Sequence, residues 1–384
     1  MALLASIVIG GAIWGTATAK EISFSEGTNF GISISPDELT IIMDLQGILW
    51  KMPVEGGTAI ALTTGQQPEV REAVFSPDGT QIVFQGFDQG YFHLWTINAD
   101  GSGLKQLTTG LYDDREPSWN ADGKTIVFAS DRSGNYDIWE IELSSGKFRQ
   151  LTNHPDDDAH PQKSLDGLKL LHTREIKRQY SEIILVEFDN DGGRKEMSLM
   201  KETGTSFFRP TWDFSNRGFS YISHNDNDIK LNYVIDANSH IANRDALIID
   251  QGDIFPFKAH WTEQGVYFTS DGQIKYRKVR SQERRNVISA NMEDISNIPF
   301  RATINSVAPN YQRKKHDFDH QENRPVRGIG HMDVSPEDNM LVYTALGDMW
   351  LQAGEGPAIN VDDEIGHVID PTWSPNGGFL AYVG

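Results

Sequence analysis

Short segments in which apolar residues alternate with polar ones recur along most of the chain, and turn residues separate them. The segments Ile82–Phe84 and Ile126–Phe128 each follow a turn, and each precedes a glycine and a second segment that ends in tryptophan. Short segments of β-branched and aromatic residues bounded by Gly, Pro, Asn and Asp are typical of β-strands. The pattern therefore predicts an all-β chain built from short antiparallel strands.

The segments belong to a repeat with a period of about 44 residues. The turn Ser76–Gly79 has equivalents at intervals of 41, 44 and 44 residues, which begin at Ser35, Asn120 and Ser164. The strand-ending tryptophans lie 45 and 44 residues apart, at Trp50, Trp95 and Trp139. A Leu-Thr pair closes each unit with the same spacing, at residues 62–63, 107–108 and 151–152. Three landmarks that share one period indicate a structural repeat.

Each repeat has the composition of four short strands joined by three turns. In the turn sequence Pro-Asp-Gly, proline presets φ, aspartate accepts a hydrogen bond from the backbone, and glycine adopts positive φ. We therefore assign structural roles in the turns to Asp78, Gly79, Asp122 and Gly123. A period near 44 residues with four strands per unit is typical of a β-propeller blade. Since one blade cannot bury both of its faces, we expect packing between blades by Trp50, Trp95, Trp139 and Trp350.

The residue before each repeated turn gives the number of blades. These positions are Ile34, Phe75, Trp119, Lys163, Trp212 and Trp261, and after a gap of 73 residues Val334 and Trp373. We predict a six-bladed propeller over 24–305, a connector over 306–324, and the first one and a half blades of a second, truncated propeller over 325–384. One irregular propeller of seven or eight blades is the alternative.

Residues 1–19 have the pattern of a secretory signal peptide. The apolar run Leu3–Trp14 is too short to cross a bilayer, and the small residues Ala17 and Ala19 follow it. No lysine or arginine precedes the run, and a buried first strand is the alternative. We expect cleavage of the signal, a periplasmic or secreted protein, and no stable membrane insertion of the mature chain.

The charge balance and the absence of cysteine narrow the classes of function. The chain has 34 Lys and Arg against 54 Asp and Glu, a formal net charge of −20, which repels nucleic acid and anionic lipid. Without cysteine it has no disulfide, thiolate metal site or cysteine nucleophile, and this composition suits an oxidising compartment. Residues 275–285 are locally basic, and we expect there a solvated or interdomain contact surface that pairs with acidic blades.

No signature of a catalytic or metal site is present in the sequence. His-x-His, His-Glu-x-x-His, Gly-x-Ser-x-Gly and a phosphate-binding loop are all missing. His316 and His320 stand in a polar segment, and Asp189–Gly192 and Asp226–Asp228 resemble calcium-loop fragments that lack the closing Glu. We predict no catalytic residue, no metal ligand and no cofactor in this chain. Both acidic segments are predicted as hairpin turns, with calcium binding as the alternative.

The best candidate for a binding site is a charged segment that precedes a repeated inner strand. Its residues are Asp113, Asp114, Arg115 and Glu116 in one repeat, and Asp157 and His160 at the equivalent place in the next. In a propeller, the segment that leads into the innermost strand lies at one mouth of the central channel. We predict that these residues bind a ligand or peptide partner. The alternative is that the aspartates cap turns and Arg115 pairs with nearby carboxylates.

Several segments resemble the repeats of TolB-type propellers. They are Ser76–Gly79, Asn98–Gly101 with Leu107 and Thr108, and the strand pair Ser130–Trp139. The resemblance covers most of residues 28–384 and implies a WD-like β-propeller fold. It also implies a protein-interaction module of the bacterial envelope, since TolB works with an outer-membrane lipoprotein. TolB-type proteins carry a small α/β domain before the propeller, whereas here the first repeat begins soon after the signal.

Other segments are similar to the propeller portion of large exported amidohydrolases. They are Glu26–Thr28, Gly47–Pro53 followed by Gly56 and Gly57, and Ala345–Trp350. This resemblance implies a propeller that docks or gates a hydrolase of C–N bonds, whose divalent metal would lie in a C-terminal domain absent from this chain. We therefore expect a non-catalytic recognition or scaffold propeller. Its partner would be that hydrolase domain, or else an envelope protein or peptide. A glycan-cleaving propeller would need paired carboxylates and an arginine cluster at the channel mouth.

Overall fold

The computed structural model describes residues 20–65, 68–176, 180–189, 193–226, 228–237, 246–284, 287–306, 328–361 and 367–383. By its contacts the chain divides into two compact units, Met1–Pro309 and Asn310–Gly384, and the boundary falls inside the segment predicted as a connector. The predicted signal peptide and the connector from residue 307 onward lie outside the described residues. Among the described residues, no helix is long and apolar enough to cross a membrane.

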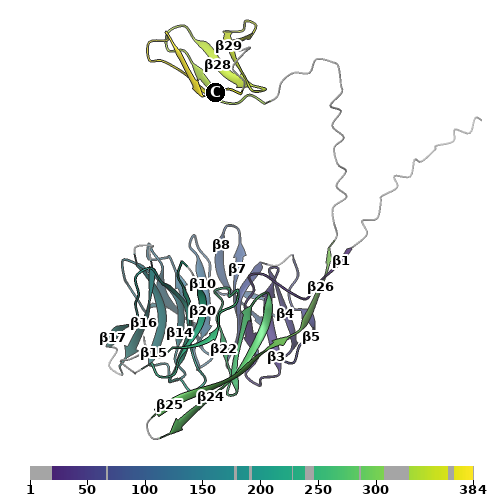
Figure 1. The fold of residues 1–384 in the computed structure, drawn as a ribbon, viewed down its shortest axis with the longest axis vertical. Helices are drawn as coiled ribbons and strands as arrows, with labels where there is room; N and C mark the ends of the chain where they lie inside the picture. The colour runs from purple at the N-terminus through teal and green to yellow at the C-terminus, as the bar shows by residue number, and fades with distance from the viewer. Residues whose placement is uncertain are drawn as a thin grey trace, which may run out of the picture. The chain divides into compact units, whose positions relative to one another are not determined.

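The described part of the first unit contains six successive antiparallel sheets, each built from four strands that are consecutive in sequence (Figure 1). The first sheet contains β2 (Ile32–Ile34), β3 (Thr40–Leu45), β4 (Ile48–Pro53) and β5 (Gly57–Ala61). The second contains β6 (Glu69–Phe75), β7 (Gln81–Asp88), β8 (Tyr91–Asn98) and β9 (Lys105–Gln106). The third contains β10 (Asp114–Trp119), β11 (Thr125–Ser130), β12 (Asp137–Glu142) and β13 (Phe148–Gln150).

The other three sheets of this unit have the same order of strands. The fourth contains β14 (Asp157–Lys163), β15 (Lys169–Ile176), β16 (Tyr180–Phe188) and β17 (Arg194–Met200). The fifth contains β18 (Ser206–Trp212), β19 (Phe219–His224), β20 (Ile229–Val234) and β21 (Leu247–Asp250). The sixth contains β22 (His260–Trp261), β23 (Gly265–Ser270), β24 (Gln273–Arg284) and β25 (Val287–Ile298). The predicted all-β architecture of four-stranded antiparallel sheets is confirmed.

Two further strands connect the end of the first unit to its beginning. β26 (Phe300–Ser306) follows the sixth sheet and pairs in parallel with β5 of the first sheet. β1 (Lys20–Phe24) pairs antiparallel with β26. The first strand of the first sheet, β2, also contacts β22 and β23 of the sixth. These contacts close the first unit into a ring after six sheets.

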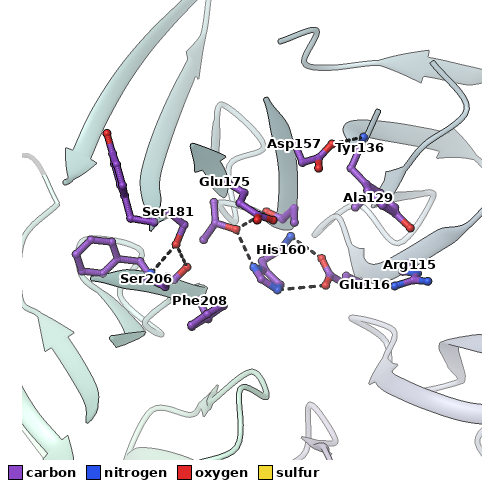
Figure 2. A pocket seen from close by; sticks show the side chains of 14 residues that line it. Arg115, Glu116, Ala129, Tyr136, Asp157, His160, Glu175, Ser181, Ser206 and Phe208 are labelled. Atoms are coloured by element: carbon purple, nitrogen blue, oxygen red, sulfur yellow. Dashed lines mark hydrogen bonds and ion pairs between the residues drawn. The ribbon is translucent and has the colours of Figure 1, made fainter. Parts of the chain in front are cut away.

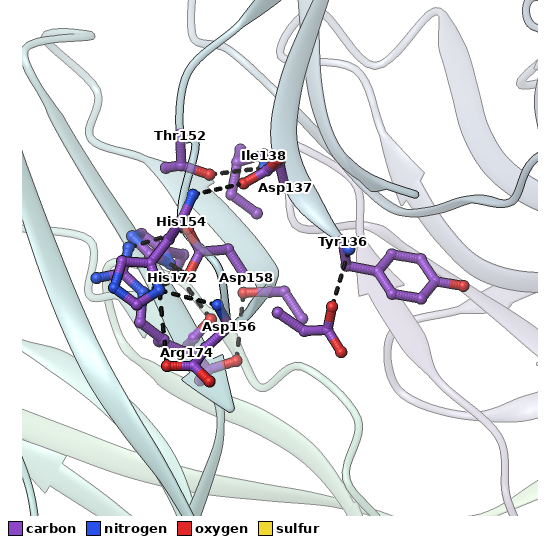
Figure 3. A network of polar contacts seen from close by, with 12 residues as sticks. Tyr136, Asp137, Ile138, Thr152, His154, Asp156, Asp158, His172 and Arg174 are labelled. Atoms are coloured by element: carbon purple, nitrogen blue, oxygen red, sulfur yellow. Dashed lines mark hydrogen bonds and ion pairs between the residues drawn. The ribbon is translucent and has the colours of Figure 1, made fainter. Parts of the chain in front are cut away.

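The Leu-Thr landmark caps a neighbouring strand in three of these sheets. The hydroxyl oxygens of three buried threonines accept hydrogen bonds of 2.9 Å from backbone N–H groups. The pairs are Thr63 with Leu49, Thr108 with Leu94, and Thr152 with Ile138, the last visible in Figure 3. A buried N–H without a partner costs free energy. Threonine therefore returns at the same place in these three repeats.

The Ser-Pro-Asp-Gly landmark closes the turn after the first strand of a sheet. Ser76 Oγ donates a hydrogen bond of 2.6 Å to Asp78 Oδ1, and this bond holds the pKa of Asp78 below its usual range. In the next sheet, Asp122 Oδ1 accepts from the backbone N–H two residues on over 2.8 Å. Gly79 and Gly123 follow with φ of 71° and 64°, in the region that favours glycine. The turn residues thus have a local structural role.

The repeated tryptophans lie in hydrophobic clusters that neighbouring sheets share. Trp50 is 1% exposed and belongs to a cluster with residues of the first and sixth sheets. Trp95 packs against a cluster of the first and second sheets, and Trp139 against one of the second and third. In the second unit, Trp350 is half-buried and donates a hydrogen bond of 3.2 Å to the carbonyl of Ala345.

A lengthened hairpin follows Trp261, where the repeat in the sequence breaks. β24 and β25 have 12 residues each, and Figure 1 shows them extending past the neighbouring strands. The locally basic segment lies largely in β24. Its Lys275 pairs with Asp250 over 3.3 Å and with Asp271 over 2.5 Å. At Lys275, therefore, the basic segment does pair with acidic residues of the same unit.

The second unit has one sheet of four strands and one of two strands in its described part. They are β27 (Met332–Val334), β28 (Met340–Ala345), β29 (Asp348–Ala353) and β30 (Ile359–Asn360), and then β31 (Ile369–Trp373) and β32 (Leu380–Val383). Val334 is 53% exposed, whereas the equivalent Ile34 of the first unit is 1% exposed. The neighbouring sheets that cover this position in the first unit thus have no counterpart among the described residues of the second.

Candidate functional site

The first strands of neighbouring sheets contact one another around the axis of the first unit. β6 contacts β2 and β10, and β14 contacts β10 and β18. Each of β6, β10, β14 and β18 contains a bulge near its middle. Each bulge places one residue at positive φ: Glu72 at 56°, Glu116 at 58°, His160 at 55° and Arg209 at 53°. Positive φ is uncommon outside glycine, and such residues gather at functional sites.

These four side chains meet and form what we name the central charge cluster. Arg209 Nη2 lies 2.8 Å from Glu72 Oε1 and 3.5 Å from Glu116 Oε1. His160 Nε2 lies 3.2 Å from the same Glu116 oxygen, and the backbone N–H of His160 donates to Glu116 Oε2 over 2.6 Å. Each of the four side chains is at most 15% exposed. The cluster therefore connects four sheets through buried polar contacts.

The pKa values in the cluster follow from burial and from these partners. Burial raises the pKa of Glu72, and the guanidinium of Arg209 counteracts part of that rise. Burial would also raise the pKa of Glu116, but contacts with His160 and Arg209 outweigh it and hold the pKa well below its usual range. Burial lowers the pKa of His160, although Glu116 pulls it upward. Glu116 therefore stays ionised at neutral pH.

A pocket of about 510 Å³ lies beside the cluster, where the strands β10, β14 and β18 begin. We name it the strand-start pocket. It is lined by backbone and side-chain atoms of the third, fourth and fifth sheets, among them Arg115, Tyr136, Asp157, His160, Ser206 and Phe208. Figure 2 shows the imidazole of His160 facing the carboxylate of Glu116, with Arg115 on the other side of Glu116. The volume of the strand-start pocket is in the range typical of ligand sites.

The structure brings four of the six predicted site residues to this pocket: Arg115, Glu116, Asp157 and His160. Asp113 and Asp114 do not line it. Asp113 Oδ1 accepts from the backbone N–H of Phe92 over 2.8 Å, and Asp114, which is fully buried, pairs with Arg132 over 2.6 Å. Asp113 therefore connects the third sheet to β8 of the second, and Asp114 stabilises the third sheet itself.

Arg115 keeps part of its hydrogen-bonding capacity free. Its Nη2 lies 2.5 Å from Asp113 Oδ2, and its guanidinium lies over the ring of Phe92 at 4.7 Å from the ring centre. Its Nε is buried and has no hydrogen-bond partner among the described residues. A buried donor without a partner costs free energy, so a ligand oxygen at this position would stabilise the side chain.

Sequence reasoning missed Glu72 and Arg209, although a signal for Arg209 was present. Glu116, His160 and Arg209 each precede a proline at the same place in successive repeats, 44 and 49 residues apart. Proline biases the preceding residue away from the right-handed helical region. Aligning the residues before these prolines would have selected three of the four members of the central charge cluster. Glu72 precedes an alanine, so no proline identifies it in the sequence.

Comparison with protein families assigns the chain to a family. The profile described as the TolB β-propeller domain matches residues 62–261, more than half of the sequence. The chain belongs to the TolB β-propeller family. The match spans β6 to β22 and so includes the strand-start pocket and the central charge cluster of this TolB-like propeller. A search among curated proteins found no significant match.

Solved structures share this fold at low sequence identity. A protein of Agrobacterium tumefaciens described as a TolB superposes with a TM-score of 0.53 and 16% identity, over 64% of this chain and 95% of its own. The tricorn protease gives a TM-score of 0.52 and 15% identity, over 93% of this chain and 33% of its own. TolB of Acinetobacter baumannii gives 0.46 and 19% identity, over 54% and 52%. The chain thus spans about half of that TolB and a third of the tricorn protease. These likenesses concern the fold, and the predicted propeller fold is confirmed.

The TolB-like propeller shows no cluster of metal-ligating side chains in its described part. No three His, Asp or Glu residues among the described ones gather in a way that could hold a metal ion. Residues 190–192 and 227 of the two acidic segments, and the pair His316 and His320, lie outside the described residues. The lining of the strand-start pocket includes hydrogen-bond donors, acceptors and aromatic rings.

Proposed function

We propose that this TolB-like propeller is a non-catalytic recognition module that binds a polypeptide partner at the strand-start pocket. The observation that carries the proposal is the guanidinium of Arg115, whose Nε has no partner while its plane rests on an aromatic ring. Arg115 can donate to a peptide carbonyl or a carboxylate. Asp157 and Glu175, at the same pocket, can accept from backbone N–H groups of the partner.

Replacing Arg115 with alanine should weaken binding of a peptide partner by at least about tenfold, because a charge-assisted hydrogen bond and a stacked surface are lost. Peptides selected on the wild-type chain from a displayed library provide the probe, and calorimetry provides the affinity. Arg149→Ala is the matched control, since Arg149 lies on the outer strand β13 with a side chain that is 65% exposed. Both variants should retain the far-UV circular dichroism of the wild type. Equal peptide affinity of Arg115→Ala and wild type would contradict the proposal.

We propose further that the chain works outside the cytoplasm of a bacterium, with an envelope protein or peptide as its partner. The apolar run with its small residues at positions 17 and 19 supports export, and the absence of cysteine agrees with an oxidising compartment. Membership of the TolB β-propeller family supports a protein–protein role.

A second candidate is a propeller that docks or gates the catalytic domain of an exported amidohydrolase. The segments Gly47–Pro53 and Ala345–Trp350 support it through their similarity to such proteins. They form equivalent strands, β4 in the first unit and β29 in the second. Under either candidate the 384-residue chain is non-catalytic. Purified chain supplied with Zn²⁺ or Mn²⁺ should therefore release no amine from N-acyl amino acids. Metal-dependent release, abolished by a chelator, would contradict a non-catalytic propeller.

A further inference from the structure

A second pocket lies at the opposite end of the first strands. The strand-start pocket lies where β10, β14 and β18 begin. β6, β10, β14 and β18 end in Phe75, Trp119, Lys163 and Trp212, all of which line this second pocket of about 450 Å³. We name it the strand-end pocket. Trp261, at the end of β22, also lines it. No residue of the strand-start pocket takes part, so the two pockets are separate sites.

Part of the rim of the strand-end pocket is apolar, although Glu38 and Asn216 also line the pocket. The turns after the first strands contribute Leu165 and Phe214, which are 63% and 55% exposed, together with Pro36 and Pro77. Exposed apolar side chains around a concave site mark a surface that binds an apolar ligand or chain. Below the rim, the edges of Trp119 and Trp212 continue the apolar wall.

The inner part of the pocket carries two polar side chains without partners. Lys258 and His260 both line it, and neither side chain forms a hydrogen bond or ion pair with a described residue, although His260 pairs with Tyr267 through the backbone. The other charged groups at this pocket have partners. Lys163 pairs with Glu140 over 2.6 Å, Asp213 accepts from Tyr233 Oη over 2.7 Å, and Glu38 Oε1 accepts from the backbone N–H of Glu263 over 3.3 Å. A largely buried ammonium without an ion-pair partner costs stability. Glu72 and Glu116 attract Lys258 without forming an ion pair with it, so Nζ keeps its hydrogen-bonding capacity for a ligand oxygen.

We propose that the strand-end pocket binds the C-terminal carboxylate of a polypeptide whose last residues are apolar. The carboxylate would accept hydrogen bonds from Lys258 Nζ and from the imidazole of His260. The preceding apolar side chains would pack against Trp119, Trp212 and Phe214 at the wall and rim. This site lies apart from the strand-start pocket and does not depend on the function proposed there.

The charges around Lys258 favour a single negative charge over a phosphate. Glu72, Glu116 and Arg209 of the central charge cluster also act on Lys258: the carboxylates raise its pKa and the guanidinium lowers it. Burial is the largest effect and lowers the pKa of Lys258 to about 8, so the ammonium form still predominates at pH 7. Burial and Lys258 lower the pKa of His260 to about 4, so His260 is a neutral donor. Lys258 and Arg209 balance the charges of Glu72 and Glu116 before a ligand binds, so a singly charged carboxylate is repelled less than a doubly charged phosphate.

The experiment compares the acetylated peptide Ala-Ala-Phe-Leu with a free C-terminus against the same peptide amidated, by calorimetry on the full chain at pH 7. We expect the free acid to bind at least about tenfold more tightly, the scale of one charge-assisted contact in a partly buried site. Lys258→Met should abolish this preference. Lys105→Met, a change of an exposed lysine on β9, should keep it, as should Arg115→Ala at the other pocket.

His260→Gln provides a second variant in case Lys258→Met does not fold, and it should reduce the preference for the acid by a few fold. Equal binding of acid and amide, or no binding of either peptide, would overturn the proposal. Octanoate binding as tightly as the free-acid peptide would assign the pocket to a fatty acid and likewise overturn it. Arg115→Ala tests binding at the strand-start pocket only. The function proposed for that pocket can therefore still be tested if the strand-end pocket does not bind the free-acid peptide.

Discussion

Replacing Arg209 with methionine should lower the free energy of unfolding of the first unit by about 3–5 kcal/mol at pH 7. The guanidinium lies between two carboxylates, Glu72 and Glu116, and its Nε donates to the carbonyl of Pro256 over 2.8 Å. Its side chain is 11% exposed, so water does not replace these contacts. Methionine keeps most of the volume but leaves buried carboxylates without their cation. Urea unfolding followed by tryptophan fluorescence gives the difference.

The deficit caused by Arg209→Met should depend on pH in a defined direction. Burial already raises the pKa of Glu72, and removal of Arg209 raises it further. A carboxyl group whose pKa is higher in the folded than in the unfolded state costs stability above its unfolded pKa, and the cost disappears as pH falls below that value. The deficit should therefore be largest near pH 7 and shrink toward pH 4. A deficit that is the same at both pH values would show that charge compensation is not its cause.

Two further variants separate charge from packing in this experiment. Arg209→Met combined with Glu72→Gln removes one of the uncompensated charges and should recover part of the lost stability at pH 7. Arg217→Met, at a side chain that is 49% exposed and 3.6 Å from Asp236, should change stability by less than about 1 kcal/mol. With the single variant Glu72→Gln added, the four proteins form a double-mutant cycle that gives the coupling energy between positions 72 and 209.

The fold could be predicted because the same residue types make the same local contacts in successive blades. Thr63, Thr108 and Thr152 each satisfy one buried N–H, and Asp78 with Gly79 closes a turn, so the same residue types return with the period of the blade. Where the structure departs from the repeat, the repeated residues are absent from the sequence. The 12-residue strands β24 and β25 have no equivalent in the earlier sheets, and the sequence shows them only as a gap.

The candidate site could be predicted only in part, because strand geometry separates neighbours in sequence. Asp113, Asp114 and Arg115 are adjacent in the chain, which suggests one site. Successive residues of a strand point to opposite faces, and Asp114 is buried against Arg132 while Arg115 lines the pocket. The central charge cluster joins residues from four sheets, so no local pattern contains it. Lys258 precedes the short strand β22 and follows no repeated landmark, so only its position in space reveals it.

A similar loss of stability, about 3–5 kcal/mol, is expected when Arg174 is replaced with methionine. Arg174 Nε and Nη2 donate to the two carboxylate oxygens of Asp158 over 2.7 and 3.0 Å, and Arg174 also contacts Glu196 (Figure 3). Asp158 is fully buried, and His172 Nδ1 lies 3.5 Å from it. Burial lowers the pKa of His172, which leaves Arg174 as the cation that compensates Asp158. Thermal and urea unfolding of the full chain would measure the loss.

The Arg174 variant also tests whether stability and recognition are separate in this propeller. Arg174 lines neither pocket, so Arg174→Met that remains folded at low temperature should bind peptides at both pockets with wild-type affinity. Combining it with Asp158→Asn should recover part of the stability, because the uncompensated charge is removed. Arg149→Met, whose partner Glu140 keeps its contact with Lys163, should cost less than about 1 kcal/mol. Weaker peptide binding by folded Arg174→Met would mean that the inter-strand ion pair also shapes the strand-start pocket.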